Sequence, residues 1–214
     1  MSKELRPFAL SLAQCEQDLG AFKALLDGKD ELSEGNDILP FFRAHPHLAA
    51  MIGSSGQRLD QIDRACEELD LFGNFRCDWA AGYWHGRSYT LVEFEDARRN
   101  SVFAVGGKYT EDWGRRFEHG FSQLVDWFYA VDMYRDNPDF RQRFGGGPVR
   151  FSGVLVAGRR HFLTPSQVER LAWRRDRVTI NTNQINFFTF DDLYDDLSGR
   201  LLFVRRIADH GDLS

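Results

Sequence analysis

The sequence predicts an α/β fold in one domain, with helices packed on a mixed sheet (α+β). Three observations support this class. Apolar residues recur at helical spacing near the N-terminus and again after residue 110, aromatic and β-branched residues flank a short turn near residue 85, and helical and strand patterns alternate from there to the C-terminus. A length of 214 residues, of which 43% are hydrophobic, is sufficient for one sizeable core.

The first part of the chain predicts short helices. Apolar residues from Leu10 to Leu26 have a helical spacing that ends before Gly28, and Ser33 is placed to cap a second helix that ends at Pro46. Residues 58–69 predict a further short helical or mixed segment. We interpret residues 1–30 as an N-terminal helical extension of the main domain.

A β-hairpin follows. Residues 74–83 and 88–95 are rich in aromatic and β-branched side chains and predict two strands. His85-Gly86 lies between them and is suited to a two-residue turn.

This turn brings acidic residues together. It places Asp78 opposite Glu93 and Arg76 opposite Glu95, and a shift by one residue would offset the pairs but keep the acids close. Directly opposed residues share a face of the sheet with Cβ atoms about 4.5–5.5 Å apart, and Glu95 joins that face because it follows Glu93 by two residues. Three carboxylates on one face predict a site for a hard cation such as Mg²⁺.

The rest of the chain predicts helices and strands in turn. Thr164, Pro165 and Gln167 form the start signal of a capped helix. The expected elements are a loop at 96–110, a long helix at 111–135 that stops at Asn137-Pro138, a glycine loop at 145–147, a buried strand at 149–157, the capped helix to about Trp173, strands at 178–180 and 186–190, and a last helix at 191–197.

Composition narrows the class of protein. No apolar run approaches the roughly 20 residues that cross a bilayer, and the N-terminus has no signal-peptide core. Cys15, Cys66 and Cys77 are an odd, widely spaced set, which argues against a disulfide framework or a zinc ribbon. We therefore expect a cytoplasmic, reduced protein that does not interact with membranes.

Basic residues are concentrated in one stretch. Residues 140–177 carry nine arginines and only two acids, although the whole chain has a net charge of −5. Arginine forks match phosphate oxygens, so this stretch could bind a nucleic-acid backbone. The alternative is a solvated basic face with scattered ion pairs.

Several segments together resemble a known family. They are Glu34–His47, Glu68–Trp79, Tyr89–Glu95, Gly120–Trp127 and Phe188–Leu193. In this order and spacing, residues of about 31–197 resemble the Shedu-type anti-phage nuclease domain of the PD-(D/E)xK nuclease superfamily. The resemblance implies a restriction-endonuclease-like core over residues 31–207. The sequence beyond Ile207 is expected to form a frayed tail at 208–214.

The resemblance also implies roles for individual residues. Asp78 and Glu93 match the positions that bind Mg²⁺ (or Mn²⁺) and take part in catalysis, and Glu68 is expected as a further metal ligand. Glu95 and Gln123 are the other expected catalytic residues, with Gln123 orienting water or phosphate. The helix acids Glu34 or Asp37 are further candidates to complete the ligand shell.

Glu95 departs from the family pattern, because it occupies the position of a lysine. A carboxylate cannot supply that positive charge, although it could act as a third metal ligand or as a base. Arg76, Arg98, Arg99 or Lys108 could supply the charge and contact substrate. Alternatively, Arg76 and Glu95 form a cross-strand ion pair worth roughly 0.2–1 kcal/mol.

Three further residues are candidates for substrate binding. His119 precedes Gln123 by four residues, so both lie on one helix face, where His119 either contacts phosphate or is ordinary surface. Arg159 and Arg160 follow the buried strand and either grip a phosphate or lie in a plain exposed turn.

The function implied by the resemblance is a metal-dependent DNA endonuclease that hydrolyses phosphodiester bonds in anti-phage defence. The alternative is a catalytically degenerate nucleic-acid-binding or scaffold protein on the same fold. DNA is the expected partner, a homodimer is expected by analogy with nucleases that need two sites, and a regulatory protein partner is compatible with both.

Overall fold

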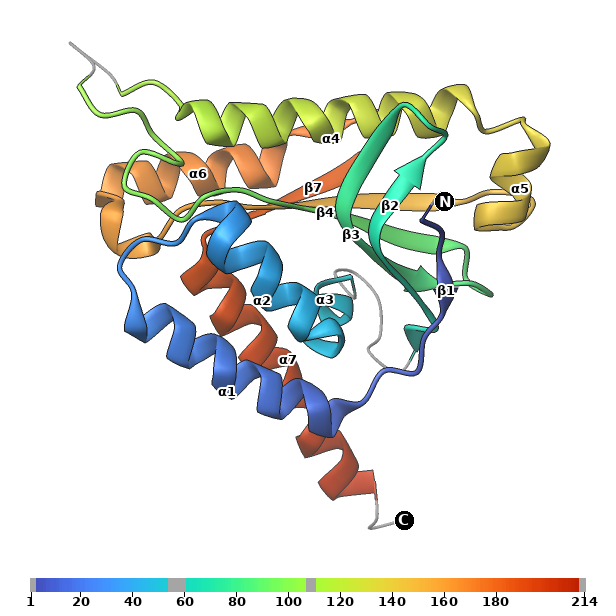
Figure 1. Cartoon of the computed structure of the whole chain (residues 1–214), viewed down its shortest axis with the longest axis horizontal. Coiled ribbons are helices and arrows are strands. Elements are labelled where there is room, and N and C mark those ends of the chain that lie inside the picture. Colours follow the sequence, from blue (N-terminus) through green and yellow to red (C-terminus); the bar gives the residue numbers. More distant parts are fainter. Residues whose placement is uncertain (1–2, 54–60, 107–110, 212–214) are drawn as a thin grey trace.

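A seven-stranded sheet forms the centre of the computed structural model, which describes residues 3–53, 61–106 and 111–211 (Figure 1). Its strand order is β1-β2-β3-β4-β5-β7-β6. The strands are β1 Arg6–Pro7, β2 Arg64–Leu71, β3 Phe75–Tyr83, β4 Ser88–Phe94, β5 Arg150–Val156, β6 Thr179–Ile180 and β7 Asn183–Phe188. The helices are α1 Leu12–Gly28, η1 Glu34–Ile38, α2 Leu39–Ala44, α3 Pro46–Ile52, α4 Arg115–Met133, α5 Pro138–Phe144, η3 Arg160–Phe162, α6 Pro165–Arg177 and α7 Phe190–Gly211.

The sheet is mixed, as predicted. Strands β1 to β4 pair in antiparallel fashion, β5 is parallel to both β4 and β7, and β6 is antiparallel to β7. A parallel neighbour needs a crossover connection, and α4 and α5 provide it between β4 and β5. The change from antiparallel to parallel pairing therefore occurs at β4, the strand that carries Glu93.

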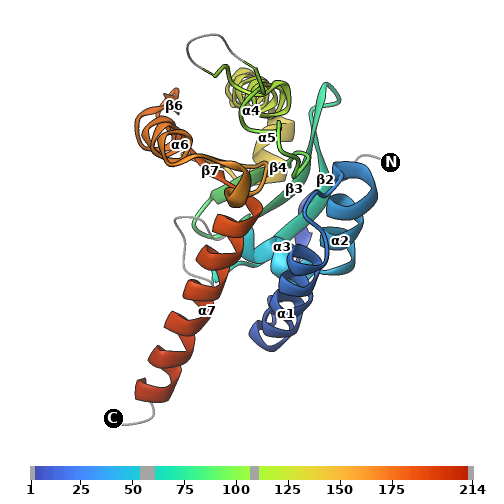
Figure 2. The same cartoon turned by 90° about the vertical axis from the view of Figure 1, so that its left-hand side faces the viewer.

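Helices cover both faces of the sheet (Figures 1 and 2). Helices α4, α5 and α6 contribute to one hydrophobic core, and α1, α2, α3 and α7 contribute to the other. Strand β4 alternates between these cores: Tyr89 and Leu91 pack toward α4, and Val92 and Phe94 pack toward the opposite layer. By this alternation Glu93 belongs to the α4 side.

The predicted hairpin register is confirmed. Ala80 pairs with Leu91, and Tyr83 pairs with Ser88 next to the turn. The backbone N–H of Arg87 donates to the carbonyl of Trp84 over 3.2 Å, so His85-Gly86 are the two central residues of the turn.

The second helix ends before Pro46, as predicted, because α2 stops at Ala44 and Pro46 occupies the first turn of the separate helix α3, where a missing N–H has no effect. Two expectations were wrong. The segment 58–69 was expected to be helical or mixed, but its described part enters strand β2, which pairs with β1 and β3. The last helix was expected at 191–197, but it runs from Phe190 to Gly211.

The N-terminal helix belongs to the main core. Cys15, Phe22 and Leu26 of α1 are buried in the same cluster as residues of α2, α3 and α7. Phe22 contacts Phe42 of α2 with ring centroids 5.5 Å apart. Helix α1 therefore packs as part of the domain.

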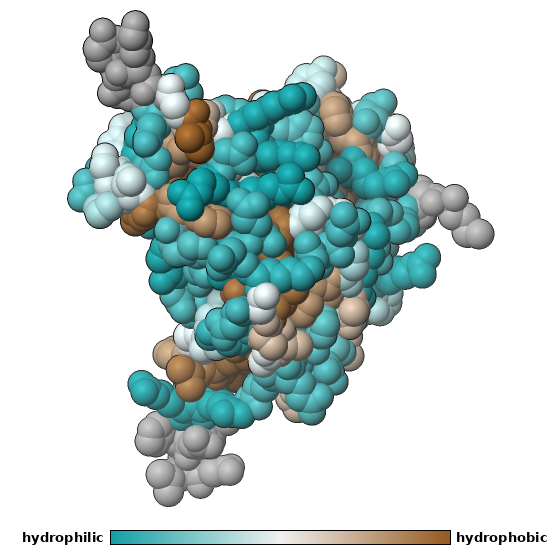
Figure 3. Space-filling model, turned by 60° about the vertical axis from the view of Figure 1, so that its left-hand side comes forward, coloured by the Kyte–Doolittle hydropathy of each residue, from teal (hydrophilic) through white to brown (hydrophobic). Residues whose placement is uncertain are grey.

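The end of α7 carries exposed apolar side chains. Leu202, Phe203 and Ile207 are each more than half exposed, on a helix that extends away from the body of the protein (Figure 2). The face drawn in Figure 3 is otherwise largely hydrophilic, with hydrophobic side chains in separate patches. In the described part of the chain, every helix is too short or too polar to span a lipid bilayer.

Candidate metal centre

Glu93 and Glu95 lie beneath helix α4 at the end of β4. Their exposed fractions are only 5% and 1%. Strand β5 fixes their backbone, because Glu93 pairs with Leu155 and the N–H of Glu95 donates to the carbonyl of Val156 over 2.9 Å. A Cβ atom placed on Gly120 of α4 would lie 3.5 Å from Cγ of Glu93 and 3.1 Å from Cγ of Glu95. The glycine therefore lets the helix approach both carboxylates.

Asp78 completes the group from the neighbouring strand. Main-chain pairing between β3 and β4 ends at Trp79 and Val92, one residue before Asp78 and Glu93. There the Oδ2 atom of Asp78 accepts a hydrogen bond from the N–H of Phe94 over 2.9 Å. The Asp78 and Glu93 side chains lie within hydrogen-bonding reach of each other. The hairpin thus brings the two acids together as its register predicts.

Burial makes the carboxylates resist ionisation. It raises the pKa of Asp78 to about 7. Burial, reinforced by the charges of Asp78 and Glu95, raises the pKa of Glu93 well above its usual value. The pKa of Glu95 is also raised by burial, against the opposing effect of its hydrogen bond to His119. Close acids of this kind need a proton or a cation between them.

Two buried side-chain oxygens, one on β4 and one on α4, lack a partner. Oε2 of Glu93 and Oε1 of Gln123 are inaccessible to solvent and accept no hydrogen bond. Buried polar atoms are normally satisfied, so an orphan oxygen among acids is a signal of a missing cation or water. A donor set of carboxylate and amide oxygens suits Mg²⁺ or Mn²⁺. The residues present therefore fit a divalent cation.

Two nitrogen-bearing side chains of helix α4 contact Glu95. Nδ1 of His119 lies 2.7 Å from Oε1 of Glu95. Nη1 of Arg116 lies 3.4 Å from Oε2 of the same side chain. Sequence reasoning considered His119 as a phosphate contact and did not identify Arg116. The helical spacing of residues 116, 119 and 123 places them along one face and could have indicated it.

Arg116 also joins two further acids to the site. Its Nη1 lies 3.2 Å from Glu34, and its Nε lies 3.2 Å from Asp96. Asp96 is 4% exposed and accepts the N–H of Glu34 over 2.8 Å. Burial raises the pKa of Glu34, and Arg116 opposes this. Of the two helix acids that the sequence offered, the structure brings Glu34 to the site. Asp37 instead pairs with Lys29 and accepts the N–H of Ser33.

Glu68 does not join the carboxylate group, contrary to the expectation that it is a metal ligand. Its carboxylate lies 2.5 Å from Lys3, 2.8 Å from Arg43 and 3.7 Å from Arg76. The hydrogen bond from Lys3 lowers the pKa of Glu68. Three cations therefore engage this side chain at a separate place on the sheet.

The predicted ion pair between Arg76 and Glu95 is wrong. Arg76 of β3 lies opposite Asp70 of β2 in the strand register, and its guanidinium lies 3.7 Å from Glu68. The β3–β4 ladder does not continue as far as these residues, and Glu95 instead continues along β5. Arg76 therefore does not supply the charge that the lysine position lacks.

The two other arginines proposed for that role differ in position. Arg98 lies 3.7 Å from Asp96 at the edge of the site. Arg99 is engaged elsewhere, because its guanidinium lies over the ring of Phe162 and its backbone N–H donates to Glu31. Lys108 lies outside the described residues.

Arg159 has a structural role, which corrects its interpretation as a phosphate contact. It is 6% exposed and pairs with Asp191 at 3.0 Å, and its remaining N–H groups donate to backbone carbonyls, including those of Leu26 and Lys29. Arg160 is more exposed and pairs with Asp192 and Asp195. Other arginines of the basic stretch, among them Arg143 and Arg174, also form ion pairs, in line with the second interpretation of that stretch.

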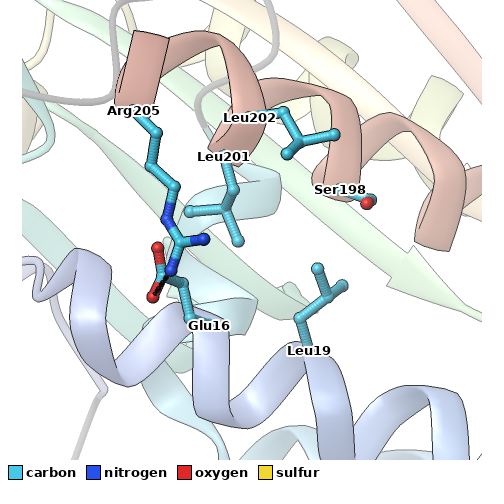
Figure 4. A pocket seen from close by; sticks show the side chains of 6 residues that line it. All are labelled: Glu16, Leu19, Ser198, Leu201, Leu202 and Arg205. Atoms are coloured by element: carbon cyan, nitrogen blue, oxygen red, sulfur yellow. Dashed lines mark hydrogen bonds and ion pairs between the residues drawn. The ribbon is translucent and has the colours of Figure 1, made fainter. Parts of the chain in front are cut away.

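A pocket of about 280 Å³ lies on the opposite side of the sheet, between α1 and α7 (Figure 4). Arg205 of α7 reaches Glu16 of α1 across it, and Leu19, Leu201 and Leu202 contribute apolar surface. Its lining includes none of the residues around Glu93, so the pocket is separate from the carboxylate group.

Comparison with known proteins identifies the family. Residues 31–194, about three quarters of the chain, match the family model described as Shedu protein SduA, C-terminal. The match includes Asp78, Glu93 and Glu95. No curated protein matches the sequence.

Proposed function

Because the chain belongs to the Shedu family, over the C-terminal region that residues 31–194 match, we propose that it is a metal-dependent DNA endonuclease in anti-phage defence. One observation carries this proposal. Glu93 is buried beside Asp78 and Glu95, and one of its oxygens has no partner. Family membership alone supports the defence role, and the carboxylate group supports the chemistry.

The acids hold the cation in this proposal. Asp78, Glu93 and Glu95 would bind Mg²⁺ or Mn²⁺ with carboxylate oxygens. Such a cation, when bound, neutralises charge on the scissile phosphate and lowers the pKa of water. Gln123 has a buried, unpartnered Oε1 atom and would accept a hydrogen bond from the attacking water. Its side chain would thereby orient the nucleophile.

Arg116 takes the role that the missing lysine leaves open. Its guanidinium reaches three acids of the site with separations of 3.2–3.4 Å, and its side chain is still 48% exposed. A cation at this position would stabilise the charge that develops on the phosphate. The substitution of Glu for Lys is therefore compatible with hydrolysis.

The arrangement of elements also supports a PD-(D/E)xK-like core. The hairpin β3–β4 supplies the two acids, β5 follows β4 in parallel, and helices cover both faces. DNA is the proposed substrate. A second copy of the chain is the proposed partner, because cutting both strands of a duplex takes two sites, and light scattering of the purified protein tests it.

The alternative is a catalytically degenerate protein that binds nucleic acid or acts as a scaffold. Arg116 forms an ion pair with Glu95, and His119 forms a hydrogen bond with it, so this carboxylate already has partners. A site balanced in this way could persist without a cation.

DNA cleavage separates the two functions. Purified protein is incubated with linear and supercoiled DNA and Mg²⁺ or Mn²⁺, beside Asp78→Asn and Glu93→Gln. Glu169→Gln, on the exposed face of α6, is the matched control. We expect cleavage by the wild type and the control and none by the two site variants. Equal cleavage by all four, or none by the wild type with either metal, would overturn the proposal.

A further inference from the structure

One imidazole lies among the buried acids. Glu93, Glu95 and His119 form a group that could hold a metal ion. In the described part of the chain, these three residues each offer one possible ligand atom, and the three atoms lie within 4.8 Å of one another. Two of these atoms are carboxylate oxygens and the third is a ring nitrogen. This mixture differs from the all-oxygen environment that Mg²⁺ prefers.

A second observation points to a cation at this place. Glu93 is 95% buried, given its exposed fraction of 5%, and its Oε2 atom has no partner. Glu93 belongs to the same group as the His119 ring. An acidic cluster alone would indicate nothing, but a buried carboxylate with an unpartnered oxygen, grouped with a nitrogen donor, indicates a ligand.

His119 has the freedom to serve as a ligand. Its side chain is 60% exposed, in contrast to the buried Glu95 that it contacts at 2.7 Å. The contact shows that the ring already points at the carboxylates. A divalent cation would replace this hydrogen bond with two bonds to the metal. Arg116 would keep its ion pairs with Glu34 and Asp96 when Glu95 turns to the metal.

Ligand chemistry then predicts which cation binds. Mg²⁺ has a strong preference for oxygen and gives up its waters reluctantly, whereas imidazole suits first-row transition metals. We propose that His119 binds the catalytic cation together with Glu93 and Glu95, and that its nitrogen makes the site prefer Mn²⁺ over Mg²⁺. The inference rests on the proposed function for the site, and it adds the identity of the metal and a ligand.

Calorimetry on the metal-free protein tests the preference. Mn²⁺ and Mg²⁺ are titrated separately into the wild type, His119→Asn and His85→Asn. His85 is an exposed histidine in the hairpin turn and serves as the matched control. We expect Mn²⁺ to bind the wild type and His85→Asn at least about tenfold more tightly than Mg²⁺, and His119→Asn to lose most of this ratio. An unchanged ratio in His119→Asn would overturn the inference.

Pulsed electron paramagnetic resonance of the Mn²⁺-loaded wild type gives a second readout that needs no variant. We expect modulation from a directly bound nitrogen, and its absence would also overturn the inference. The outcome for the proposed function is separate. Mn²⁺ binding through nitrogen without DNA cleavage would support the metal site and contradict the nuclease function. DNA cleavage with Mn²⁺ bound only through oxygen would support the nuclease function and contradict the role of His119 as a ligand.

Discussion

The carboxylate of Asp78 takes the place of a main-chain acceptor for the N–H of Phe94. Oδ2 of Asp78 and the backbone nitrogen of Phe94 are 2.9 Å apart, just beyond the last main-chain pair of β3 and β4. A candidate metal ligand thus also joins the two strands that form the site. Substitutions at Asp78 therefore report on folding as well as on chemistry.

Substitution of Asp78 by Asn and by Ala should give proteins of different stability. Asn retains an oxygen that accepts the Phe94 N–H, whereas Ala leaves that N–H unsatisfied. We expect Asp78→Asn to be more stable than Asp78→Ala by about 1–3 kcal/mol. Both variants lack the charge, so the comparison isolates the hydrogen bond. Urea unfolding of both proteins in a chelator measures the difference, and equal stabilities would contradict the structural role.

Stability of the metal-free protein should fall as pH rises. Burial raises the pKa of Asp78 to about 7, whereas an exposed aspartate titrates near ~4. The acid binds its proton more tightly in the folded state, so its contribution is fully present below pH ~4 and is lost as pH rises toward about 7 and above. Glu93 and Glu95, whose pKa values are also raised, add to the loss. Arg116 and His119 lower the pKa of Glu95 and so moderate the loss, whereas the charge of Glu34 raises the pKa values of all three acids and adds to it.

Melting temperatures between pH 5 and 8.5 in a chelator test this dependence. Asp78→Asn and Glu93→Gln should flatten the curve and melt higher than the wild type at pH 8.5, while Glu169→Gln follows the wild type. Addition of Mn²⁺ should restore wild-type stability at high pH but have little effect on Glu93→Gln. A wild-type curve that rises with pH would contradict the burial argument.

Two adjacent arginines should differ in their effect on stability. Arg159 is 6% exposed, and its removal leaves Asp191 without its ion-pair partner and several backbone carbonyls without the guanidinium N–H groups that donate to them. We expect Arg159→Met to destabilise the fold by about 3–5 kcal/mol. Arg160 makes more exposed ion pairs, so Arg160→Met should change stability by no more than about 1 kcal/mol. Equal losses of stability for Arg159→Met and Arg160→Met in chemical denaturation would contradict the structural role of Arg159.

Arg116 should affect cleavage without weakening metal binding. Its guanidinium competes with a cation for Glu34, Glu95 and Asp96. We expect Arg116→Gln to lower the rate of DNA cleavage by about 10²-fold or more, with Mn²⁺ affinity equal to or higher than that of the wild type. Arg115→Gln, at the neighbouring exposed position of α4, is the control. Loss of metal affinity in Arg116→Gln would point to a structural role.

Local signals explain what the sequence could predict. The turn residues His85-Gly86 sit between two β-rich runs, and period-2 alternation then fixes which carboxylates share a face. The capping box at Thr164 and Gln167 forms as expected. Because these signals depend on residues close in the chain, the hairpin and helix α6 were predictable.

Features set by distant parts of the chain were not predictable. Strand β2 contains Glu67, Glu68 and Leu69, which favour helix, and becomes a strand because β1 and β3 pair with it. Glu68 has a φ of 50°, and residues Cys66 and Leu69 on either side of it pack toward the same core, so the alternation of faces breaks there. Helical spacing could indicate that Arg116 shares a face with His119, but the contacts of Arg116 with Asp96 and Glu34 depend on the approach of α4 and η1, which lie far apart in the sequence.

Gly120 should be intolerant of even the smallest side chain. A Cβ atom at this position would lie 2.5 Å from Cδ1 of the fully buried Leu155 and 3.1 Å from Cγ of Glu95. Alanine favours a helix interior by about 1 kcal/mol over glycine, but the overlap forces α4 away from β4 and β5 at a cost of about 1–3 kcal/mol. We expect Gly120→Ala to lower the melting temperature and to weaken Mn²⁺ binding, because Glu95 is displaced.

Gly20→Ala in α1, where no atom lies within 4 Å of the added Cβ, should leave metal binding unchanged and raise stability slightly. A similar gain in melting temperature for Gly120→Ala and Gly20→Ala would show that the close approach of α4 to the carboxylates is not required.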